Sequence, residues 1–525
     1  MELKPLKNIR TYYLAFVVYW GAILFGYDTG IAGGVIEQTA FKEHFLNNEN
    51  QVNQEGATDI TGNIVAVLQA GAFFGALGSA SISQRIGRKY TLAFFTLIFI
   101  VGAILQTISG SGGRGLGYIY SGRIIAGIGI GAISAVAPAF VSECSPKNVR
   151  GRITGLFQIL VVIGVMISYF VNFGISQHNP VGPRVWQIPF GLQLVPAMMM
   201  FISVFTIKES PRWLASKGKI SEAYENLAYL RRGTLESVND EMIEIIAAVD
   251  EEKESREGLN NRNAFYEAFF GKGNLIRFII AFVIFLGQQL TGQNTINYYG
   301  PQIFESIGYE GVTNSLLASG IYGVIKVIAT IIFVNLLVDS LGRRFSLALS
   351  SFGMGTLFFI VGALLKTHPP PTTDSKTDGT GPGPESSSKV MAALLYLYVA
   401  FFSMGWGPLP WIYSADIFPT RTRHYGMSVA SASQWLWNFV ITRVTPNLVR
   451  ALGWKIFVLY GSLNIALLFP FSLWIPETKG RGLEEMDVIF GAIPKDQHEA
   501  KLAESEQAIS NLHQDRESSK IVMIE

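Results

Sequence analysis

Three ionisable residues, Asp28, Arg123 and Lys326, lie inside apolar stretches that are long enough to cross a membrane. A charge at such a position is costly, so each residue is a functional hypothesis that needs a partner. At about 1.5 Å of rise per helical residue, Asp28 and Arg123 lie about 24 and 30 Å from the cytoplasmic ends of their helices, so the two could meet. An acid that takes up a proton and releases an arginine is a proton switch, and a permanent structural ion pair is the alternative.

Lys326 lies about 20 Å from the cytoplasmic end of its helix, too deep for its side chain to reach the surface easily. A neutral sugar does not need a buried ammonium, whereas a carboxylated ligand does. The alternatives are that Lys326 neutralises an acid elsewhere in the chain or faces a polar crevice.

Three amides share a further apolar stretch. Gln288 and Gln289 lie near its middle, about 20 Å from its cytoplasmic end, and Asn294 follows one to two turns later. Amides both donate and accept hydrogen bonds, so they suit a polyhydroxylated ligand. Hydrogen bonding between helices is the alternative for amides in a membrane.

Four aromatic residues accompany these polar groups. Trp411 and Trp435 can offer apolar faces to a sugar ring. Tyr298 and Tyr299 lie near the outer end of the stretch that holds the amides, where they predict an outer gate or, alternatively, an interfacial aromatic belt.

The composition predicts that the elements holding these residues are membrane helices. Of 525 residues, 49% are hydrophobic and only 15% are charged, against about 25% charged residues in soluble domains. The net charge of +2, without a dominant basic block, argues against a nucleic-acid partner. The single cysteine, Cys144, excludes a disulfide scaffold and a cysteine-based metal cluster. We expect no metal and no cofactor.

Apolar stretches of about 20 residues recur along the chain and predict an all-α membrane protein. We expect twelve spans: 12–34, 61–83, 90–108, 118–142, 153–176, 190–207, 276–298, 315–338, 344–365, 391–414, 426–449 and 454–475. Lys and Arg concentrate in alternate short loops, which places both termini in the cytoplasm. We therefore divide the chain into an N-terminal half (1–207), a helical cytoplasmic linker (208–275), a C-terminal half (276–486) and a disordered tail (487–525).

An internal repeat supports this division, because three charged motifs recur in the same order about 255–273 residues apart. Two similar halves with a site between them are typical of transporters. We expect the motifs to form a cytoplasmic gating network that bridges the halves when the inner side is closed. Simple anchoring of helix ends by positive charges is the alternative. The network residues are Arg85, Arg88, Lys89, Glu143, Arg150, Arg152, Glu209, Arg343, Arg344, Asp416, Arg423 and Glu477.

Over about residues 10–490 the chain resembles the sugar porter family of the major facilitator superfamily. The motifs that carry the likeness are 85–89, 143–152, 209–214, 288–294 and 476–481. The resemblance implies a fold of twelve helices in two pseudo-symmetric six-helix halves. It also implies substrate contacts at Gln158 and Asn438, and at Gln434, where the family often has Asn. Two departures are Gln84 in place of the usual Asp and Asp416 in place of Glu.

Proton-coupled members of the family carry an Asp on the first span and an Arg on the fourth, which facilitative relatives generally lack. Segments 320–326, 406–411 and 419–426 look closest to the quinate and sugar-acid permeases of fungi. We therefore expect a proton-coupled symporter of the plasma membrane that imports a quinate-like or galacturonate-like acid by alternating access. The alternatives are a hexose or pentose transporter, as a symporter or a uniporter, and a transporter-like nutrient sensor.

We expect no enzyme, because the chain has no HExxH metal pair, no Walker A loop and no convincing nucleophile triad. The expected partners are a small polyhydroxylated substrate, a proton and the lipid bilayer. We expect the protein to work as a monomer.

Overall fold

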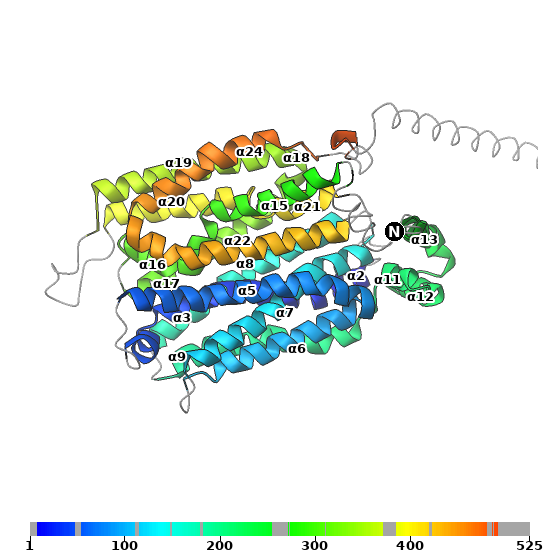
Figure 1. The fold of residues 1–525 in the computed structure, drawn as a ribbon, viewed down its shortest axis with the longest axis horizontal. Helices are drawn as coiled ribbons and strands as arrows, with labels where there is room; N and C mark the ends of the chain where they lie inside the picture. Colours follow the sequence, from blue (N-terminus) through cyan, green and yellow to red (C-terminus); the bar gives the residue numbers. More distant parts are fainter. Residues whose placement is uncertain are drawn as a thin grey trace, which may run out of the picture.

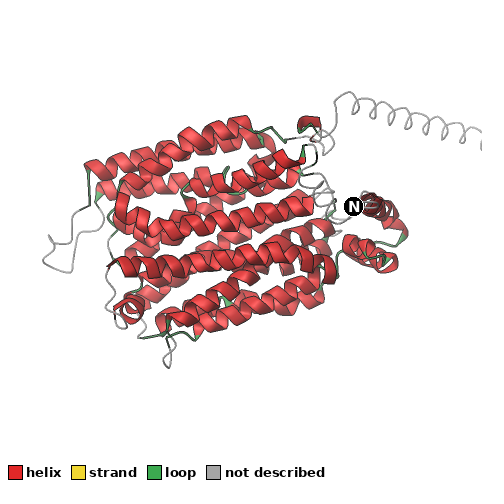
Figure 2. Ribbon diagram, viewed as in Figure 1, coloured by secondary structure: helices red, strands yellow, loops and turns green. Residues whose placement is uncertain are grey.

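The computed structural model describes residues 8–47, 54–110, 115–146, 150–178, 182–254, 271, 273–309, 311–370, 385–418, 423–479, 486 and 488–491. The described part of the chain is a bundle of long helices running side by side (Figures 1 and 2). Most of the expected tail beyond residue 487 lies outside the described residues.

Six crossings make up the N-terminal half. Their helices are α2 (Ile9–Val18) with α3 (Trp20–Glu37), α5 (Gln54–Ile86), α6 (Arg88–Thr107), α7 (Leu116–Cys144), α8 (Arg150–His178), and α9 (Arg184–Leu192) with α10 (Leu194–Ser203). The short α4 (Thr39–Lys42) follows the first crossing. Most of these helices extend a few residues beyond the expected spans, because polar residues at the ends of an apolar stretch continue its helix.

The C-terminal half repeats this arrangement. Its helices are α15 (Asn274–Leu290) with α16 (Gln293–Ser306), α17 (Val312–Ile332) continued to α18 (Val338–Leu341), α19 (Arg343–Thr367), α20 (Ser386–Ser403) with α21 (Leu409–Ile417), α22 (Arg423–Leu452), and α23 (Lys455–Leu463) continued to α24 (Phe469–Trp474). The halves pack against each other through α3 with α16, α5 with α22, and α8 with α17.

Eleven of the described crossings are long and apolar enough to span a membrane by composition alone. The twelfth is α22, whose 30 residues correspond to about 45 Å of helix. The mean hydropathy of α22 is lower than that of the other eleven crossings, because the helix carries polar residues such as Gln434, Asn438 and Arg443. The twelve-helix fold is thus confirmed, and its least apolar helix is one that faces the other half.

Two crossings of the C-terminal half are broken in the middle. The break between α15 and α16 contains Gly292, whose φ of +88° is a left-handed conformation that glycine adopts without strain. The break between α20 and α21 lies at residues 404–408, where the sequence Met-Gly-Trp-Gly-Pro cannot continue a regular helix. The tenth span therefore consists of two helices joined by this break.

The bundle has two distinct ends. At one, here called the linker end, lie the beginning of the described chain and the linker helices α11 (Pro211–Ser216), α12 (Ile220–Arg231) and α13 (Asn239–Glu254) (Figure 1). The linker helices share a small core of their own, which includes Leu214, Leu227 and Met242. The opposite end, here called the loop end, carries α4.

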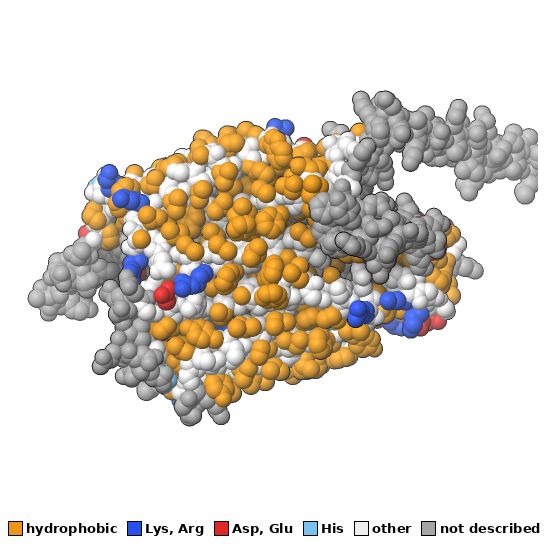
Figure 3. Space-filling model, in the orientation of Figure 1, with side chains coloured by type: hydrophobic (Ala, Val, Ile, Leu, Met, Phe, Trp, Pro, Cys, Tyr) orange, Lys and Arg blue, Asp and Glu red, His pale blue; other side chains and the backbone are white. Residues whose placement is uncertain are grey.

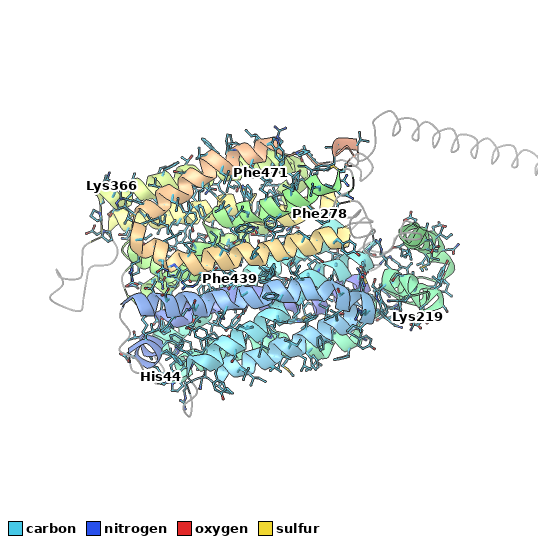
Figure 4. All side chains as sticks on the ribbon, in the orientation of Figure 1. His44, Lys219, Phe278, Lys366, Phe439 and Phe471 are labelled. Carbon is cyan, nitrogen blue, oxygen red and sulfur yellow. The ribbon has the colours of Figure 1, made fainter. Side chains whose placement is uncertain are left out.

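The surface between the two ends is apolar. In the view of Figure 3, hydrophobic side chains cover the middle of the bundle and charged side chains gather toward its ends. Figure 4 labels His44 and Lys366 at the loop end and Lys219 at the linker end. Phe74, Leu336 and Trp474 are among the large hydrophobic side chains that are exposed. A surface of this kind is suited to lipid and not to water.

Candidate functional site

The structure brings Asp28 of α3 and Arg123 of α7 together, with 3.5 Å between Oδ1 and Nη1. The two side chains are 1% and 0% exposed. Within the described residues neither side chain makes a hydrogen bond, so each charge has only the other to offset its burial. Removing the charge of one partner from such a pair leaves the other uncompensated, at a cost of about 3–5 kcal/mol. The pair is therefore sensitive to the protonation of Asp28.

Tyr298 of α16 lies beside this pair and belongs to the other half. Its hydroxyl accepts a hydrogen bond of 3.0 Å from Nδ2 of Asn438, and it is close enough to Asp28 and Arg123 to interact with both charges. At Gly33 of α3 a Cβ would collide with the backbone carbonyl of Tyr298, so α3 and α16 approach each other closely here. The phenol thus contacts a proposed substrate residue and lies within electrostatic range of the ion pair.

Tyr299 lies next to Tyr298 in the same region. Its hydroxyl donates a hydrogen bond to the backbone carbonyl of Thr442 at 3.0 Å. Both tyrosines are completely buried and pack with residues of α3, including Ile31 and Val35. An ion pair of 3.0 Å between Asp59 of α5 and Arg443 of α22 also joins the halves. The halves are in contact at this level of the bundle, where the sequence predicted a gate.

Gln289 of α15 lies in a chain of amides that joins three helices. Its Nε2 donates to Oε1 of Gln434 on α22 at 2.8 Å, and its Oε1 accepts a hydrogen bond from Nδ2 of Asn294 on α16. Three of the predicted substrate residues therefore lie side by side at one level of the bundle. Their donors and acceptors now satisfy one another and can be exchanged for the hydroxyl groups of a ligand.

The neighbouring Gln288 has a different role. Its Nε2 donates to the backbone carbonyls of Trp406 at 2.7 Å and Gly407 at 3.0 Å. These carbonyls lie in the break between α20 and α21, where they have lost their helical partners. Oε1 of Gln288 is buried and makes no hydrogen bond with the described residues. The side chain thus supports the break and keeps one acceptor available.

Lys326 of α17 is 4% exposed. Its ammonium donates to Oδ1 of Asn297 at 3.0 Å and lies 5.6 Å from the centre of the Phe402 ring. Among the described residues no carboxylate lies within ion-pair distance of this ammonium. The charge of Lys326 is therefore hydrogen-bonded but not balanced by an acid in the described part of the chain.

Three polar residues around Lys326 were missed by the sequence analysis. Asn297 accepts from Lys326, Gln293 donates from Nε2 to Oδ1 of Asn297 at 2.9 Å, and Tyr322 donates to Oε1 of Gln293 at 2.8 Å. Nδ2 of Asn297 donates in turn to Oδ1 of Asn294 at 3.2 Å. Three amides within five residues of one half-helix, at 293, 294 and 297, were a signal that could have identified the cluster.

The remaining predicted contacts are less central. Trp435 is fully buried, donates from Nε1 to Oγ of Ser134 at 3.1 Å and packs on Phe25, so it faces the N-terminal half. Trp411 is half-buried and meets Phe285 edge to face. Gln158 is half-buried on α8, about 12 Å from the beginning of the helix. Its contact with substrate stays a prediction.

At the linker end, charged residues of the N-terminal half form a compact cluster. The Arg88 guanidinium donates to both oxygens of Glu143, with distances of 2.9 and 3.0 Å. The carboxylate of Glu209 accepts the backbone N–H groups of Arg88 and Lys89, each at 3.1 Å, and so caps α6. Gly87, with φ of +94°, provides the space, because a Cβ there would collide with that carboxylate.

The C-terminal half has an equivalent cluster of charged residues. Glu477 accepts the backbone N–H groups of Arg343 at 2.9 Å and Arg344 at 3.0 Å, and so caps α19. Gly342, with φ of +85°, stands where Gly87 stands in the other half. Nε of Arg343 lies 3.5 Å from Oδ2 of Asp416, which corresponds to the pair of Arg88 with Glu143.

The two capping carboxylates differ in acidity. Burial raises the pKa of Glu209 above the ordinary glutamate value, although the N–H groups of Ser210, Lys89 and Arg88 act to lower it. Burial also acts to raise the pKa of Glu477, but backbone N–H donors from 343, 344, 478 and 479 outweigh it and leave the pKa below the ordinary value. The two helix caps have the same geometry, but the pKa values of their carboxylates are shifted in opposite directions.

The network expected to bridge the halves when the inner side is closed stays a prediction. The ion pairs of Arg88 with Glu143 and of Arg343 with Asp416 each join elements of one half. Their primary structural role is to hold helix ends together within a half. Arg85 is exposed, and the side chains of Arg150, Arg152 and Arg423 lie outside the described residues.

Comparisons with known proteins agree with this architecture. The family model "Sugar (and other) transporter" matches residues 14–490. A probable quinate permease of Neosartorya fischeri is 35% identical over 497 residues, 94% of this chain and 89% of that protein. The quinate permease of Emericella nidulans is 36% identical over 498 residues, 94% of this chain and 90% of that protein.

Solved structures show the same fold. The proton:xylose symporter XylE bound to 6-bromo-6-deoxy-D-glucose matches with a TM-score of 0.76 and 26% identity. The match covers 92% of this chain and 100% of the XylE chain. The protein is thus an integral multi-pass membrane transporter and not an enzyme, and it belongs to the sugar porter family of the major facilitator superfamily.

Proposed function

We propose that this transporter is a proton-coupled symporter that imports a sugar-like acid of the quinate or galacturonate type by alternating access. The observation that carries the proposal is the buried ammonium of Lys326, which contacts the amide Asn297 and has no carboxylate partner among the described residues. Two of its three N–H donors remain for a ligand. A buried charge without a counter-charge is costly, so a ligand that supplies one gains binding energy.

The cluster next to Lys326 supplies the recognition of hydroxyl groups. Asn297 connects Lys326 to Asn294, and Asn294 connects to Gln289 and Gln434. A ligand with one carboxylate and several hydroxyl groups matches a cation that adjoins a row of amides. The names of the fungal relatives, quinate permeases, describe a ligand of that chemistry.

Asp28 and Arg123 are the proposed proton switch. Protonation of Asp28 removes the counter-charge of Arg123, and the rearrangement that follows reaches Tyr298 and the contact between the halves. A proton that moves down 100 mV yields about 2.3 kcal/mol, enough for roughly fifty-fold accumulation. XylE, a structure of the same fold, is a proton:xylose symporter, which supports coupling here.

The linker end is the proposed cytoplasmic side, because Lys and Arg of the short loops concentrate there. Closed clusters of the kind built by Glu209 and Glu477 hold helix ends together on that side while the halves rock around the site. We place the protein in the plasma membrane and propose that it works as a monomer.

The test is uptake of labelled quinate, galacturonate and xylose by a transport-null host, with and without a protonophore. We expect concentrative uptake of an acid that collapses to equilibrium when the protonophore is added. Uptake of the acid that resists the protonophore would contradict the proposed coupling.

A hexose or pentose transporter is the second candidate. The amides Gln289, Gln434 and Asn438 can bind a neutral sugar without help from Lys326, and the similar XylE structure holds a hexose derivative. Saturable uptake of xylose without uptake of either acid would favour this candidate over the first.

A further inference from the structure

Asn297 is the point at which the separate parts of the site meet. It lies on α16 and is 5% exposed. Its Oδ1 accepts two hydrogen bonds, from Nζ of Lys326 at 3.0 Å and from Nε2 of Gln293 at 2.9 Å. Its Nδ2 donates to Asn294 at 3.2 Å, and its backbone carbonyl accepts from the hydroxyl of Tyr169 on α8 at 2.7 Å. It therefore connects the buried cation, the amide cluster and the other half.

We propose that Asn297 is a specificity-determining residue, which holds the Lys326 ammonium in the empty site and yields it to the carboxylate of the substrate. This inference rests on the proposed function, that the substrate is a carboxylated polyol. The side chain of Asn297 has no charge, and its proposed effect on substrate selectivity comes from that neutrality.

An amide and a carboxylate differ as partners for an ammonium. An amide oxygen supplies a hydrogen bond but no charge, and hydrogen bonds between two ionised groups are about twice as strong as neutral ones. The carboxylate of a substrate can therefore displace Asn297 from Lys326. Asn297 keeps the hydrogen bond from Gln293 after the exchange, so its Oδ1 is not left unpaired.

Elsewhere in the same chain, a buried cation has a carboxylate as its partner. Arg123, the other fully buried intramembrane cation described above, has the carboxylate of Asp28 as its partner. An aspartate at position 297 would differ from Asn297 by one atom group and would place a carboxylate 3.0 Å from Lys326. The cation would then be neutralised from within, and an acidic substrate would lose its advantage over a neutral one.

The experiment compares quinate with quinamide, its uncharged carboxamide, in proteoliposomes that contain the full chain. In Asn297→Asp we expect the KM for quinate to rise about ten- to hundred-fold while that for quinamide stays within about three-fold, as loss of one charged hydrogen bond predicts. In Asn297→Gln, which keeps a neutral amide, we expect the preference for quinate to remain.

A double-mutant cycle with Lys326→Met sharpens the result. If Asn297 acts through the ammonium, Asn297→Asp has little further effect on quinate once Lys326 has been replaced. If Asn297→Asp does not fold, Asn297→Leu removes the oxygen without adding a charge. In that variant the ammonium lacks the neutral partner that quinate must displace, so we expect the KM for quinate to fall about three- to ten-fold relative to that for quinamide.

Two outcomes overturn the inference and are distinct from failure of the proposed function. Equal losses for quinate and quinamide in Asn297→Asp would show a structural role only, and no change for either compound would show that residue 297 does not set selectivity. In both cases a selective loss of quinate in Lys326→Met would leave the proposed function standing. If the wild type fails to distinguish quinate from quinamide and Lys326→Met changes neither, the proposed function itself fails.

Discussion

Two of the buried cations, Arg123 in the N-terminal half and Lys326 in the C-terminal half, have different kinds of partner. Arg123 in the N-terminal half faces the carboxylate of Asp28 at 3.5 Å and makes no side-chain hydrogen bond with the described residues. Lys326 in the C-terminal half donates a hydrogen bond to the amide of Asn297, with no carboxylate near it in the described part of the chain. One cation has charge balance without hydrogen bonds, and the other has a hydrogen bond without charge balance.

The two arrangements respond to different events. A charge-balanced pair that lacks other partners changes state when its acid is protonated, because the arginine is then unpaired in a medium that cannot solvate it. A hydrogen-bonded cation without a counter-charge changes state when an anion arrives. We therefore propose that the N-terminal half responds to a proton and the C-terminal half to a carboxylated substrate.

The largest effect expected is from Asp28→Asn, which removes the charge balance of Arg123. We expect accumulation to fall from roughly fifty-fold to equilibrium, because a proton no longer drives the cycle, while exchange of substrate across the membrane persists. Accumulation ratios and counterflow in the same vesicles measure the two. Glu37→Gln is the matched control, because Glu37 is a buried acid of the same helix that pairs with Lys42. Retained uphill uptake in Asp28→Asn would remove the proposed role of the pair.

A smaller effect, and one that does not discriminate between substrates, is expected from Gln289→Leu. The change leaves Oε1 of Gln434 and Nδ2 of Asn294 without their partner, at about 1–2 kcal/mol, so kcat/KM should fall roughly five- to thirty-fold for acid and neutral sugar alike. Gln106→Leu, a buried amide of α6 that bonds the carbonyl of Gly102, is the control. A loss confined to the acid would show that Gln289 belongs with Lys326 and not with the hydroxyl-binding cluster.

The smallest effect concerns the two helix caps at the linker end. The raised pKa of Glu209 means that it takes up a proton at a higher pH than Glu477, whose pKa is lowered. As pH falls, the cap of α6 should therefore weaken before the cap of α19. Hydrogen exchange of the segments that begin at Arg88 and Arg343, corrected for intrinsic rates, measures this order. Glu209→Gln should abolish the pH dependence at α6 only, and simultaneous loss of both caps would contradict the assignment.

Depth in the membrane could be predicted from the sequence, but the direction of a side chain could not. Counting helical rise brought Asp28 and Arg123 to the same level, and the structure places them in contact. The adjacent Gln288 and Gln289 were predicted to act alike. They point to different partners, because successive residues on a helix are about 100° apart and α15 lies between the break at 404–408 and α22.

The contacts of Asn297 could not be predicted from the sequence either. An amide beside two tyrosines on a half-helix gave no indication of which neighbour it contacts, because that neighbour, Lys326, comes from another helix. The charged motifs at the linker end were correctly paired by their repeat within the sequence. Their assignment to contacts between the halves stays a prediction, because a repeat identifies equivalent residues and not the partners of each.

The central claim is that Lys326 receives the carboxylate of the substrate, and the most direct measurement is the uptake of quinate and quinamide by Lys326→Met beside wild type. Lys366→Met is the matched control, because Lys366 is an exposed lysine at the loop end that lies over the Trp454 ring. We predict that Lys326→Met loses about hundred-fold in kcat/KM for quinate, as expected for a buried charge pair, and keeps quinamide uptake within a few-fold. Equal losses for the two compounds, or quinate uptake like that of wild type, would contradict the account.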